Sequence, residues 1–359
     1  MASRFRLLDL NEDCVKTVLQ CFDGFDLISF SLCSKKRLAN VRSLKLHIDE
    51  LSLYCGNTFY AKYDFGGNRT NLVFCENGYD SDIAESDIRP RRLQVDYIEG
   101  SYPLEQLNWV DENLDHENWG DENQEPVTRH WRKASFSGSD WLRHIMSVFN
   151  CDKIGFFSVM RSKFEIDSLM DTVRNLNIFE TTILQAVSKE HTLRLLTALP
   201  CIDHLTVDSL TLNEPSEHSI FLRNQHNLTV RTQNKMTLDS VLSVNSFSLE
   251  CSGLPIKSIN RFIKLWKKGA NPRLRHLCVS FFANLAVLNE LVVLNENDVL
   301  RGVQHLRMPQ EYLRLFEMPE TRQAEVIGGF DIIGKTGRKA TVTLENRALD
   351  SMFRMYIWQ

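Results

Sequence analysis

The 359-residue sequence predicts an α/β protein: a small helical unit at the N-terminus, then an irregular leucine-rich-repeat-like solenoid of strands and helices that ends in a β-hairpin unit. Three observations predict this order. Three short amphipathic segments precede residue 48, similar short strands recur between residues 157 and 279, and glycines near residue 335 separate two strand-like runs. The expected boundaries are 1–48 for the helical unit, 49–138 for an irregular connecting region and 139–359 for the repeat-like body.

The composition, 43% hydrophobic and 25% charged, is typical of a soluble globular protein. The net charge of -4 provides no overall basic field, so we expect no nucleic-acid partner. Nine scattered cysteines without a C-x-x-C pair indicate reduced thiols, and therefore a cytoplasmic or nuclear protein. Charges interrupt the apolar residues at the N-terminus, and Glu290 interrupts the longest apolar stretch, so we expect no secretory signal and no membrane association.

The first amphipathic segment predicts a helix with Asn11 as its N-cap. Four apolar residues share one face of this helix: Val15, Val18, Leu19 and Phe22. Gly24 is the expected end, Asp26 the expected cap of a second helix, and Ser34 the expected cap of a third. Helices this short bury too little apolar surface to be stable alone, so we expect them to need a partner.

The run FRLLDLNEDCVKTVLQCFDGFDLISFSLCSKKRLANVRSLKL resembles an F-box of the nematode type, which we place at residues 5–48. The resemblance implies docking on a Skp-type adaptor that links to a cullin ligase scaffold. It also implies these adaptor-facing residues: Leu7, Leu8, Leu10, Val15, Leu19, Phe25, Leu27, Ile28 and Leu32. Asn11 stands where F-boxes usually carry proline. The alternative is an ordinary helical bundle whose apolar face is core, because periodicity does not distinguish a core face from a docking face.

Residues 111–125 contain seven Asp or Glu and no Lys or Arg. Within and beside this segment Asn-Trp-Val-Asp-Glu-Asn recurs ten residues later as Asn-Trp-Gly-Asp-Glu-Asn. The spacing does not match a calcium-binding EF-hand loop, so we expect a solvated acidic loop. The alternative function is a contact surface in which Trp109 and Trp119 anchor a basic partner, since tryptophan is enriched at binding hot spots.

Helical and strand periods alternate after residue 139. Ser139 is the expected cap of one helix, and the clearest helix runs from Ser258 to Lys268, with Gly269 as its stop. Strands are expected at 157–159, near 182, and at 205–207, 228–230, 247–249 and 277–279. Their intervals of 19 to 30 residues are close to those of leucine-rich repeats, although the asparagine signature of such repeats is absent.

Four further stretches resemble the F-box-associated domain, type 2, of the same nematode family: SINRFIKLWKKGANPRLRHLCVSF, DVLRGV, GGFDIIGKTGRKATVTL and the closing MYIWQ. We place this domain at about residues 200–350. The resemblance implies a substrate-recognition subunit of a cullin-based ubiquitin ligase, which binds its target through the C-terminal body. Such a subunit is an adaptor and not an enzyme. The alternative is a protein-interaction scaffold without a role in ubiquitination.

Gly329 to Thr336 match the phosphate-binding pattern G-x-x-x-x-G-K-[ST], which makes a P-loop nucleotide-binding protein a remote alternative. A P-loop opens a helix, whereas Ala340, Val342 and Leu344 alternate with polar residues and predict a strand. We therefore expect a hairpin that turns at residues 334–337. No cysteine or histidine arrangement indicates catalysis or metal binding, so we expect no cofactor.

Strand alternation also predicts a recognition face. Leu277, Val279 and Phe281 are expected in the core. By the same alternation Thr206, Thr229 and Ser248 are expected to point outward. With the nearby Arg231 they form the candidate face that contacts the target.

Overall fold

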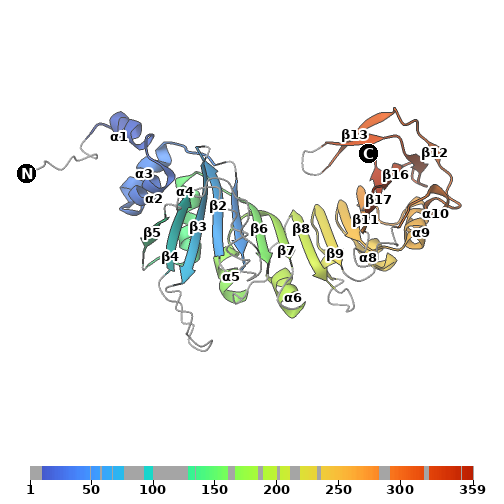
Figure 1. Ribbon diagram of the computed structural model, residues 1–359, viewed down its shortest axis with the longest axis horizontal. Coiled ribbons are helices and arrows are strands. Elements are labelled where there is room, and N and C mark those ends of the chain that lie inside the picture. The colour runs from blue at the N-terminus through green and yellow to red at the C-terminus, as the bar shows by residue number, and fades with distance from the viewer. Residues whose placement is uncertain are drawn as a thin grey trace, which may run out of the picture. The chain divides into compact units, whose positions relative to one another are not determined.

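The computed structural model describes residues 10–48, 50–56, 59–66, 68–76, 93–99, 128–133, 135–160, 166–184, 189–199, 203–210, 219–232, 236–282, 292–318, 323–348 and 350–358. The chain divides into an N-terminal unit, Met1–Phe179, and a C-terminal unit, Glu180–Gln359 (Figure 1). In the described part of the chain, no helix is long and apolar enough to span a bilayer.

Three short helices open the N-terminal unit: α1 (Glu12–Leu19), α2 (Gly24–Leu32) and α3 (Lys35–Ser43). The side chain of Asn11 caps α1 by accepting from the backbone of Cys14 at 2.8 Å, and Ser34 caps α3, as predicted. Asp23 caps α2, so the prediction of Asp26 is wrong. Asp26 instead donates its backbone N–H to Asp23 at 2.7 Å from the first turn, where an aspartate is also favourable.

The connecting region, expected to be irregular, contains five strands: β1 (Leu51–Cys55), β2 (Phe59–Phe65), β3 (Asn68–Glu76), β4 (Leu93–Glu99) and β5 (Thr128–Arg132). They pair antiparallel in sequence order, and β6 (Ile154–Met160) pairs parallel with β1. In β1 every second residue is buried, which is the pattern of a strand with one face on the core. Short strands joined by turns look irregular in sequence because each is too brief to show a period.

The same unit contains α4 (Gly138–Val148) and α5 (Ile166–Val173). The cap of α4 is Ser137 and not the predicted Ser139. Ser137 accepts from the backbone of Asp140 at 3.2 Å, and the Asp140 carboxylate accepts from the backbone of Ser137 at 3.0 Å. This capping box begins the helix two residues earlier and places Trp141, Leu142 and Ile145 in the core.

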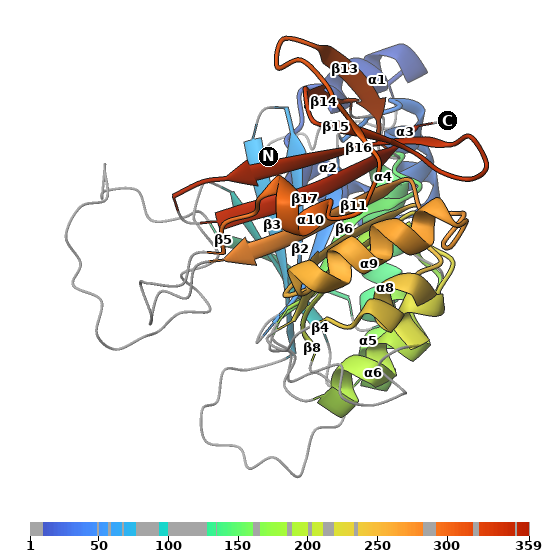
Figure 2. The same cartoon turned by 90° about the vertical axis from the view of Figure 1, so that its right-hand side faces the viewer.

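Parallel strands alternate with helices in the C-terminal unit: β7 (Ile178–Leu184), α6 (Lys189–Ala198), β8 (His204–Leu210), the 3-10 helix η3 (Ser219–Leu222), β9 (Asn227–Thr232), α8 (Leu238–Ser243), β10 (Ser248–Ser252), α9 (Ile256–Lys267) and β11 (His276–Phe282). The boundary between the units falls within β7. Each predicted strand is present, and successive strands from β7 to β11 pair in parallel. Helices α6, α8 and α9 lie along one side of these strands (Figure 2).

A short helix and a set of antiparallel strands complete the unit: α10 (Glu296–Val299), β12 (Leu306–Arg307), β13 (Leu313–Glu317), β14 (Gln323–Ile327), β15 (Phe330–Ile333), β16 (Lys339–Asn346) and β17 (Asp350–Ile357). β17 pairs with β11, and β15 and β16 form the predicted hairpin. Gly337 has a φ of 77°, the left-handed backbone that favours glycine in this turn. β13 and β14 form a separate two-stranded sheet.

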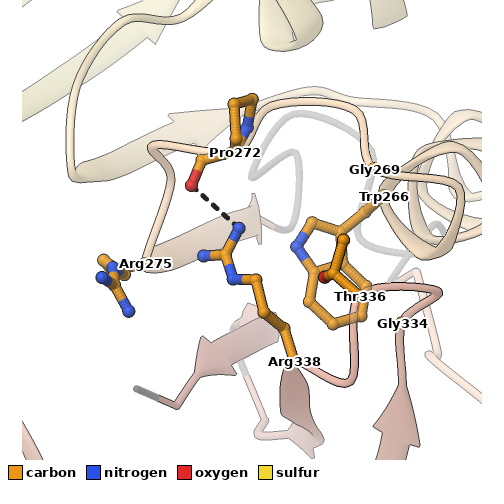
Figure 3. A pocket seen from close by; sticks show the side chains of 7 residues that line it. All are labelled: Trp266, Gly269, Pro272, Arg275, Gly334, Thr336 and Arg338. Atoms are coloured by element: carbon orange, nitrogen blue, oxygen red, sulfur yellow. Dashed lines mark hydrogen bonds between the residues drawn. The ribbon is translucent and has the colours of Figure 1, made fainter.

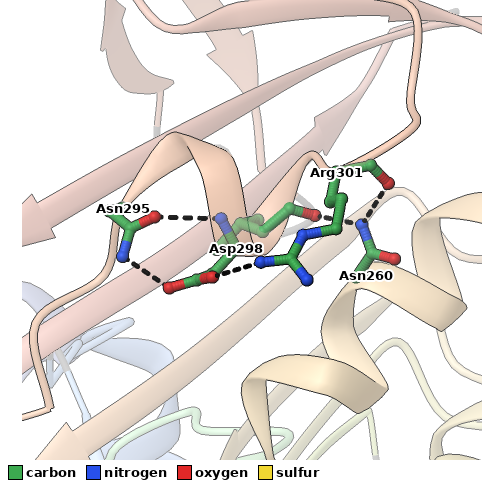
Figure 4. Close-up of polar contacts among 5 residues, drawn as sticks. Asn260, Asn295, Asp298 and Arg301 are labelled. Carbon is green, nitrogen blue, oxygen red and sulfur yellow. Dashed lines mark hydrogen bonds and ion pairs between the residues drawn. The ribbon is translucent and has the colours of Figure 1, made fainter.

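Helix α10 is tied to α9 by an asparagine. The Asn260 side chain donates to the backbone oxygens of Val299 at 2.8 Å and Arg301 at 3.1 Å (Figure 4). Asn295 caps α10 by accepting from the backbone of Asp298 at 2.9 Å, and Arg301 forms an ion pair with the Asp298 carboxylate. These contacts fix the DVLRGV segment against α9.

Both faces of β11 are covered near its start. Leu277 and Val279 are fully buried on the helix side, as predicted, whereas Phe281 is half-buried. On the other side the ring of Phe316 from β13 lies 6.4 Å from the ring of His276. The β13–β14 hairpin therefore covers a face that strand alternation predicts to be open.

Candidate functional site

The structure places four of the nine predicted adaptor-facing residues in a core. Val15, Leu19, Leu27 and Ile28 are at most 5% exposed. Leu10, Phe25 and Leu32 are half-buried, and Leu7 and Leu8 lie outside the described residues. For the four buried leucine, valine and isoleucine side chains, the expectation of direct access to a partner is wrong, since the three helices use them to pack on one another and on the rest of the unit.

Helix α2 also packs on β5, through the side chains of Phe25 and Ser29. The ring of Phe25 stacks on Trp131 at 4.4 Å between centroids, and Nε1 of Trp131 donates to Ser29 Oγ at 2.7 Å. Arg129 lies over the ring of Phe25 and forms an ion pair with Asp23. The three helices therefore share one packed unit with the sheet that follows them.

A buried hydrogen-bond chain joins α2 to α4. Ser31 Oγ donates to the backbone oxygen of Ile28 at 2.7 Å and lies 2.7 Å from Nε2 of His144. Because the hydroxyl has a single hydrogen, Nε2 of His144 is the donor in the second bond. Burial, with a smaller contribution from Lys133, lowers the pKa of His144 to about 4, so the imidazole is neutral at neutral pH.

Part of the apolar surface of these helices stays accessible. Phe22 and Phe30 are half-buried and meet edge to face at 6.2 Å between ring centroids. Arg37 of α3 lies 5.2 Å from the Phe30 ring. Phe30 was missed as a candidate contact residue, since its place on the accessible side depends on how α2 packs against β5.

The β13–β14 hairpin carries a second accessible surface, here called the hairpin face and made of Leu313, Leu315 and Ile327. Their side chains are 51%, 54% and 55% exposed, and Leu313 lies opposite Ile327 in the register. The opposite side of the hairpin is buried, with Phe316 and Val326 packed against Tyr356. Exposed apolar residues gathered on one face are characteristic of interaction sites.

The hairpin face has an acidic margin. Glu325 lies opposite Leu315 in the register, and Glu317 continues the same side of β13. Both glutamates are exposed. The sequence analysis did not identify this surface, because five-residue strands show which residues alternate but not which side is covered.

The predicted recognition face divides into two parts. Thr206 and Thr229 are neighbours in the β8–β9 register and are half-buried, and Arg231 is exposed. Ser248 is only 2% exposed, so the expectation that it points into solvent is wrong. Trp109, Trp119 and the acidic segment 111–125 lie outside the described residues.

Ser248 belongs to a row of polar side chains that crosses four neighbouring strands at one level: His204, Asn227, Ser248 and His276. Asn227 Nδ2 donates to Nδ1 of His204 at 2.7 Å. Each of the four residues directly precedes a leucine in its strand. That repeated polar-leucine pair is the sequence signal that predicts the row.

The glycine-rich GKT segment forms the turn between β15 and β16 and does not begin a helix. The backbone N–H of Gly334 donates to Arg338 at 2.8 Å, and that of Lys335 donates to Lys267 at 2.7 Å. A P-loop holds phosphates with such amides, whereas here these two are engaged in the fold.

Thiol chemistry has little support in the C-terminal unit. Burial raises the pKa of Cys278 to about 11 and also raises the pKa of Cys251, so both thiols stay protonated at neutral pH. Three exposed cysteines lie in α1 or beside the N-terminal helices: Cys14, Cys21 and Cys33. Within the described ranges, no group of three or more His, Cys, Asp or Glu side chains is arranged to hold a metal ion.

Comparison with protein-family models identifies the N-terminal helices as an F-box. The F-box domain model matches residues 7–48, which include α1 to α3. The F-box associated model matches residues 217–279, from η3 into β11. The chain thus carries an F-box at its N-terminus and an F-box associated domain in its C-terminal unit.

One curated relative is the F-box associated domain-containing protein sdz-33 of Caenorhabditis elegans, 26% identical over 197 residues. The alignment covers 54% of this chain and 61% of the relative, so it spans less than two thirds of that protein. No solved structure matches the chain. F-box domains are typical of non-catalytic adaptors that bring substrates to ubiquitin ligases, and F-box associated domains are typical of the part that binds the target.

Proposed function

We propose that this chain is the substrate-recognition subunit of a cullin-based ubiquitin ligase. The F-box binds a Skp-type adaptor, and the C-terminal unit binds a target protein. The observation that carries the proposal is the F-box match at residues 7–48 followed by the F-box associated match at 217–279. The functional division we propose is 1–48 for adaptor binding and about 200–350 for target binding.

The adaptor contact uses the accessible side of the three helices. Phe22 and Phe30 form its centre, and the half-buried Leu10 and Leu32 are further candidates that the resemblance includes. Aromatic side chains supply large contact areas at low entropic cost, which favours them as anchors of an interface. Leu7 and Leu8 remain candidates by resemblance. Val15, Leu19, Leu27 and Ile28 support this surface from inside.

The target contact uses the C-terminal unit. The hairpin face supplies exposed apolar area, and its glutamates favour a partner with basic residues beside an apolar segment. Thr206, Thr229 and Arg231 form a second, more polar candidate, and Trp109 and Trp119 a third. We also propose that the parallel strands β7–β11 with α6, α8 and α9 form a leucine-rich-repeat-like body.

The mechanism is proximity. A target held by the C-terminal unit, on a ligase held by the F-box, meets the charged conjugating enzyme at a high effective concentration. The chain itself supplies no catalytic residue to this scheme. The chain raises the rate of ubiquitin transfer because it binds the ligase and the target at the same time.

Co-purification tests the proposal. Tagged full-length chain, expressed in cells, should recover both a Skp-type adaptor and a cullin. Recovery of the adaptor without cullin would favour the alternative, an interaction scaffold without a role in ubiquitination. Recovery of neither, by a chain with a normal unfolding transition, would overturn the proposal.

A further inference from the structure

The β13–β14 hairpin has two strand edges that pair with no other strand. It forms a sheet of its own, and in the described ranges no backbone hydrogen bond joins residues 313–317 or 323–327 to a further strand. An unpaired edge presents a row of N–H and C=O groups that can pair with an added strand. The hairpin therefore offers backbone hydrogen bonds beside the apolar side chains of the hairpin face.

On β13, the same residues supply the unpaired backbone groups and the accessible side chains. The backbone N–H of Gly328 donates to the oxygen of Tyr312 at 3.0 Å, one step beyond the pair of Leu313 and Ile327. Hydrogen-bonded and non-bonded pairs alternate along an antiparallel ladder, so residues 313, 315 and 317 form the non-bonded pairs. Their N–H and C=O groups thus point away from β14, and their side chains are exposed.

The other side of the hairpin is anchored. Arg314 forms an ion pair with Asp331 at 2.9 Å and donates to the backbone oxygen of Gly328 at 3.2 Å. The ring of Phe316 meets that of Tyr356 edge to face at 5.1 Å between centroids. These contacts hold β13 extended before any partner binds, which lowers the entropic cost of association.

The hairpin offers an open edge and not a pocket. A pocket of about 360 Å³ in the same unit lies between α9 and the β15–β16 turn, where Trp266, Arg275 and Arg338 are among its lining residues (Figure 3). No residue of β13 or β14 lines it. Recognition at the hairpin must therefore come from strand pairing and from the side chains beside it, which suits an extended segment.

The side chains along β13 specify what such a segment carries. Leu313 and Leu315 are more than half exposed, and the exposed Glu317 ends the row. Cross-strand neighbours stabilise a sheet when both are apolar or when their charges are opposite. An antiparallel segment therefore matches β13 when Lys or Arg lies opposite Glu317, and apolar residues lie opposite Leu315 and Leu313.

A second copy of this chain fits the edge less well. Two β13 strands that pair antiparallel about Leu315 place each Glu317 opposite Leu313 of the other copy. Both carboxylates then lack a charge partner across the strands. The charge pattern thus favours a basic partner over self-association.

We propose that β13 captures the target by strand addition, pairing antiparallel with an extended segment of the pattern basic-x-apolar-x-apolar. The inference rests on the proposed function, which supplies a target protein as the source of the segment. Backbone pairing provides affinity, and alternate side chains select the sequence. β-branched residues suit the two apolar positions because they favour the strand conformation.

Fluorescence anisotropy with the full-length chain tests the edge. The probe is a labelled, capped peptide with the core Lys-Thr-Val-Thr-Val, and the control is its isomer Lys-Val-Val-Thr-Thr. The probe should bind about tenfold more tightly, because only in the probe do the lysine and both valines share one face. No binding of the probe, or equal binding of the isomer, would overturn the proposal.

N-methylation distinguishes strand addition from contact through side chains alone. Opposite Leu313 and Leu315, the valine amides face β13 and donate to it, whereas the threonine amides face away. Methylating both valine nitrogens should weaken binding about tenfold or more, and methylating both threonine nitrogens should change it little. Equal losses from the two modifications would contradict strand addition.

Charge reversal tests the register. Glu317→Lys should weaken binding of the probe about threefold, and it should bind the peptide Glu-Thr-Val-Thr-Val more tightly than the unchanged chain does. Glu325→Lys is the matched control, because it makes the same change on the same face but one strand farther from the segment. Its effect should be smaller. Equal or larger weakening by Glu325→Lys would overturn the placement on β13.

Sedimentation tests the second copy as an occupant. The unchanged chain and Leu315→Lys should have the same mass in solution. A dimer of the unchanged chain that this variant loses would assign the edge to self-association and overturn the proposal.

Adaptor recovery in the same preparations separates this inference from the proposed function. Adaptor binding with no probe binding overturns strand addition alone. Probe binding with no adaptor overturns the proposed function and the target as source of the segment, but supports the edge.

Discussion

Ser248 Oγ lies 2.9 Å from Nδ1 of His276, where β10 and β11 run side by side under the β13–β14 hairpin. Both residues are at most 3% exposed. This bond satisfies two polar groups that strand alternation alone would place in solvent, and it makes Ser248 a structural residue. Of the proposed recognition residues on the strands, Thr206, Thr229 and Arg231 stay accessible.

Ser248→Ala should lower the free energy of unfolding by about 1–3 kcal/mol, because Nδ1 of His276 would lose its buried partner. Chemical denaturation followed by circular dichroism measures the change. Thr229→Ala, which alters a half-buried hydroxyl on the adjacent strand, should change stability by less than about 0.5 kcal/mol. Equal effects of the two substitutions would show that the Ser248–His276 bond contributes nothing.

Acid should destabilise the C-terminal unit through His276. Burial, and then Arg354, lowers the pKa of His276 to about 4, below the value of about 6.5 expected in the unfolded chain. The stabilisation is fully present above pH 6.5 and is lost as the pH falls to 4, because the unfolded state takes up the proton first.

Across that pH range the loss from this histidine should be about 3 kcal/mol. Denaturant unfolding at pH 7 and pH 5 compares the full chain with His276→Gln. The variant should be less stable at pH 7 but less sensitive to acid. The same pH dependence in both chains would contradict the assignment to His276.

The aromatic pair on the F-box should separate binding from folding. Phe22→Asp with Phe30→Asp should abolish adaptor co-purification while the chain keeps a cooperative unfolding transition, because both side chains are half-buried. Leu27→Asp should lose adaptor and stability together, since an unpaired charge in a site only 1% exposed is costly.

Leu306→Asp with Tyr312→Asp provides the matched control, because it adds the same charge to exposed apolar residues of the other unit. Adaptor recovery should be normal in this variant. Normal recovery by the Phe22 and Phe30 double variant would exclude those rings from the adaptor contact.

The hairpin face should act in target capture and not in stability. Leu315→Lys with Ile327→Lys should reduce proximity labelling of targets, with little change in Tm, because more than half of each side chain is already in solvent. Phe316→Ala, on the covered side, should cost about 3–5 kcal/mol. An unchanged set of labelled proteins in the lysine variant would direct attention to Thr206, Thr229 and Arg231, or to Trp109 and Trp119.

The sequence by itself determined those elements that depend only on residues close to one another along the chain. Asn11 and Ser34 cap helices because their side chains reach amides three residues away. The turn at Gly334–Gly337 follows from glycine and from the alternation beyond it. The strands from β7 to β11 lie where similar short runs recur at regular intervals in the sequence. The F-box motif was likewise visible, since it is a contiguous run.

Tertiary structure alone decided what covers each face. Periodicity identifies Leu27 and Ile28 as apolar-face residues, but packing within the helical unit and against β5 makes them core and leaves Phe22 and Phe30 accessible. The hairpin that buries the His276 side of β11 is built from residues about forty positions away. Arg275 and Arg338 meet in one pocket for the same reason: contacts between distant segments depend on the whole fold, and no local pattern encodes them.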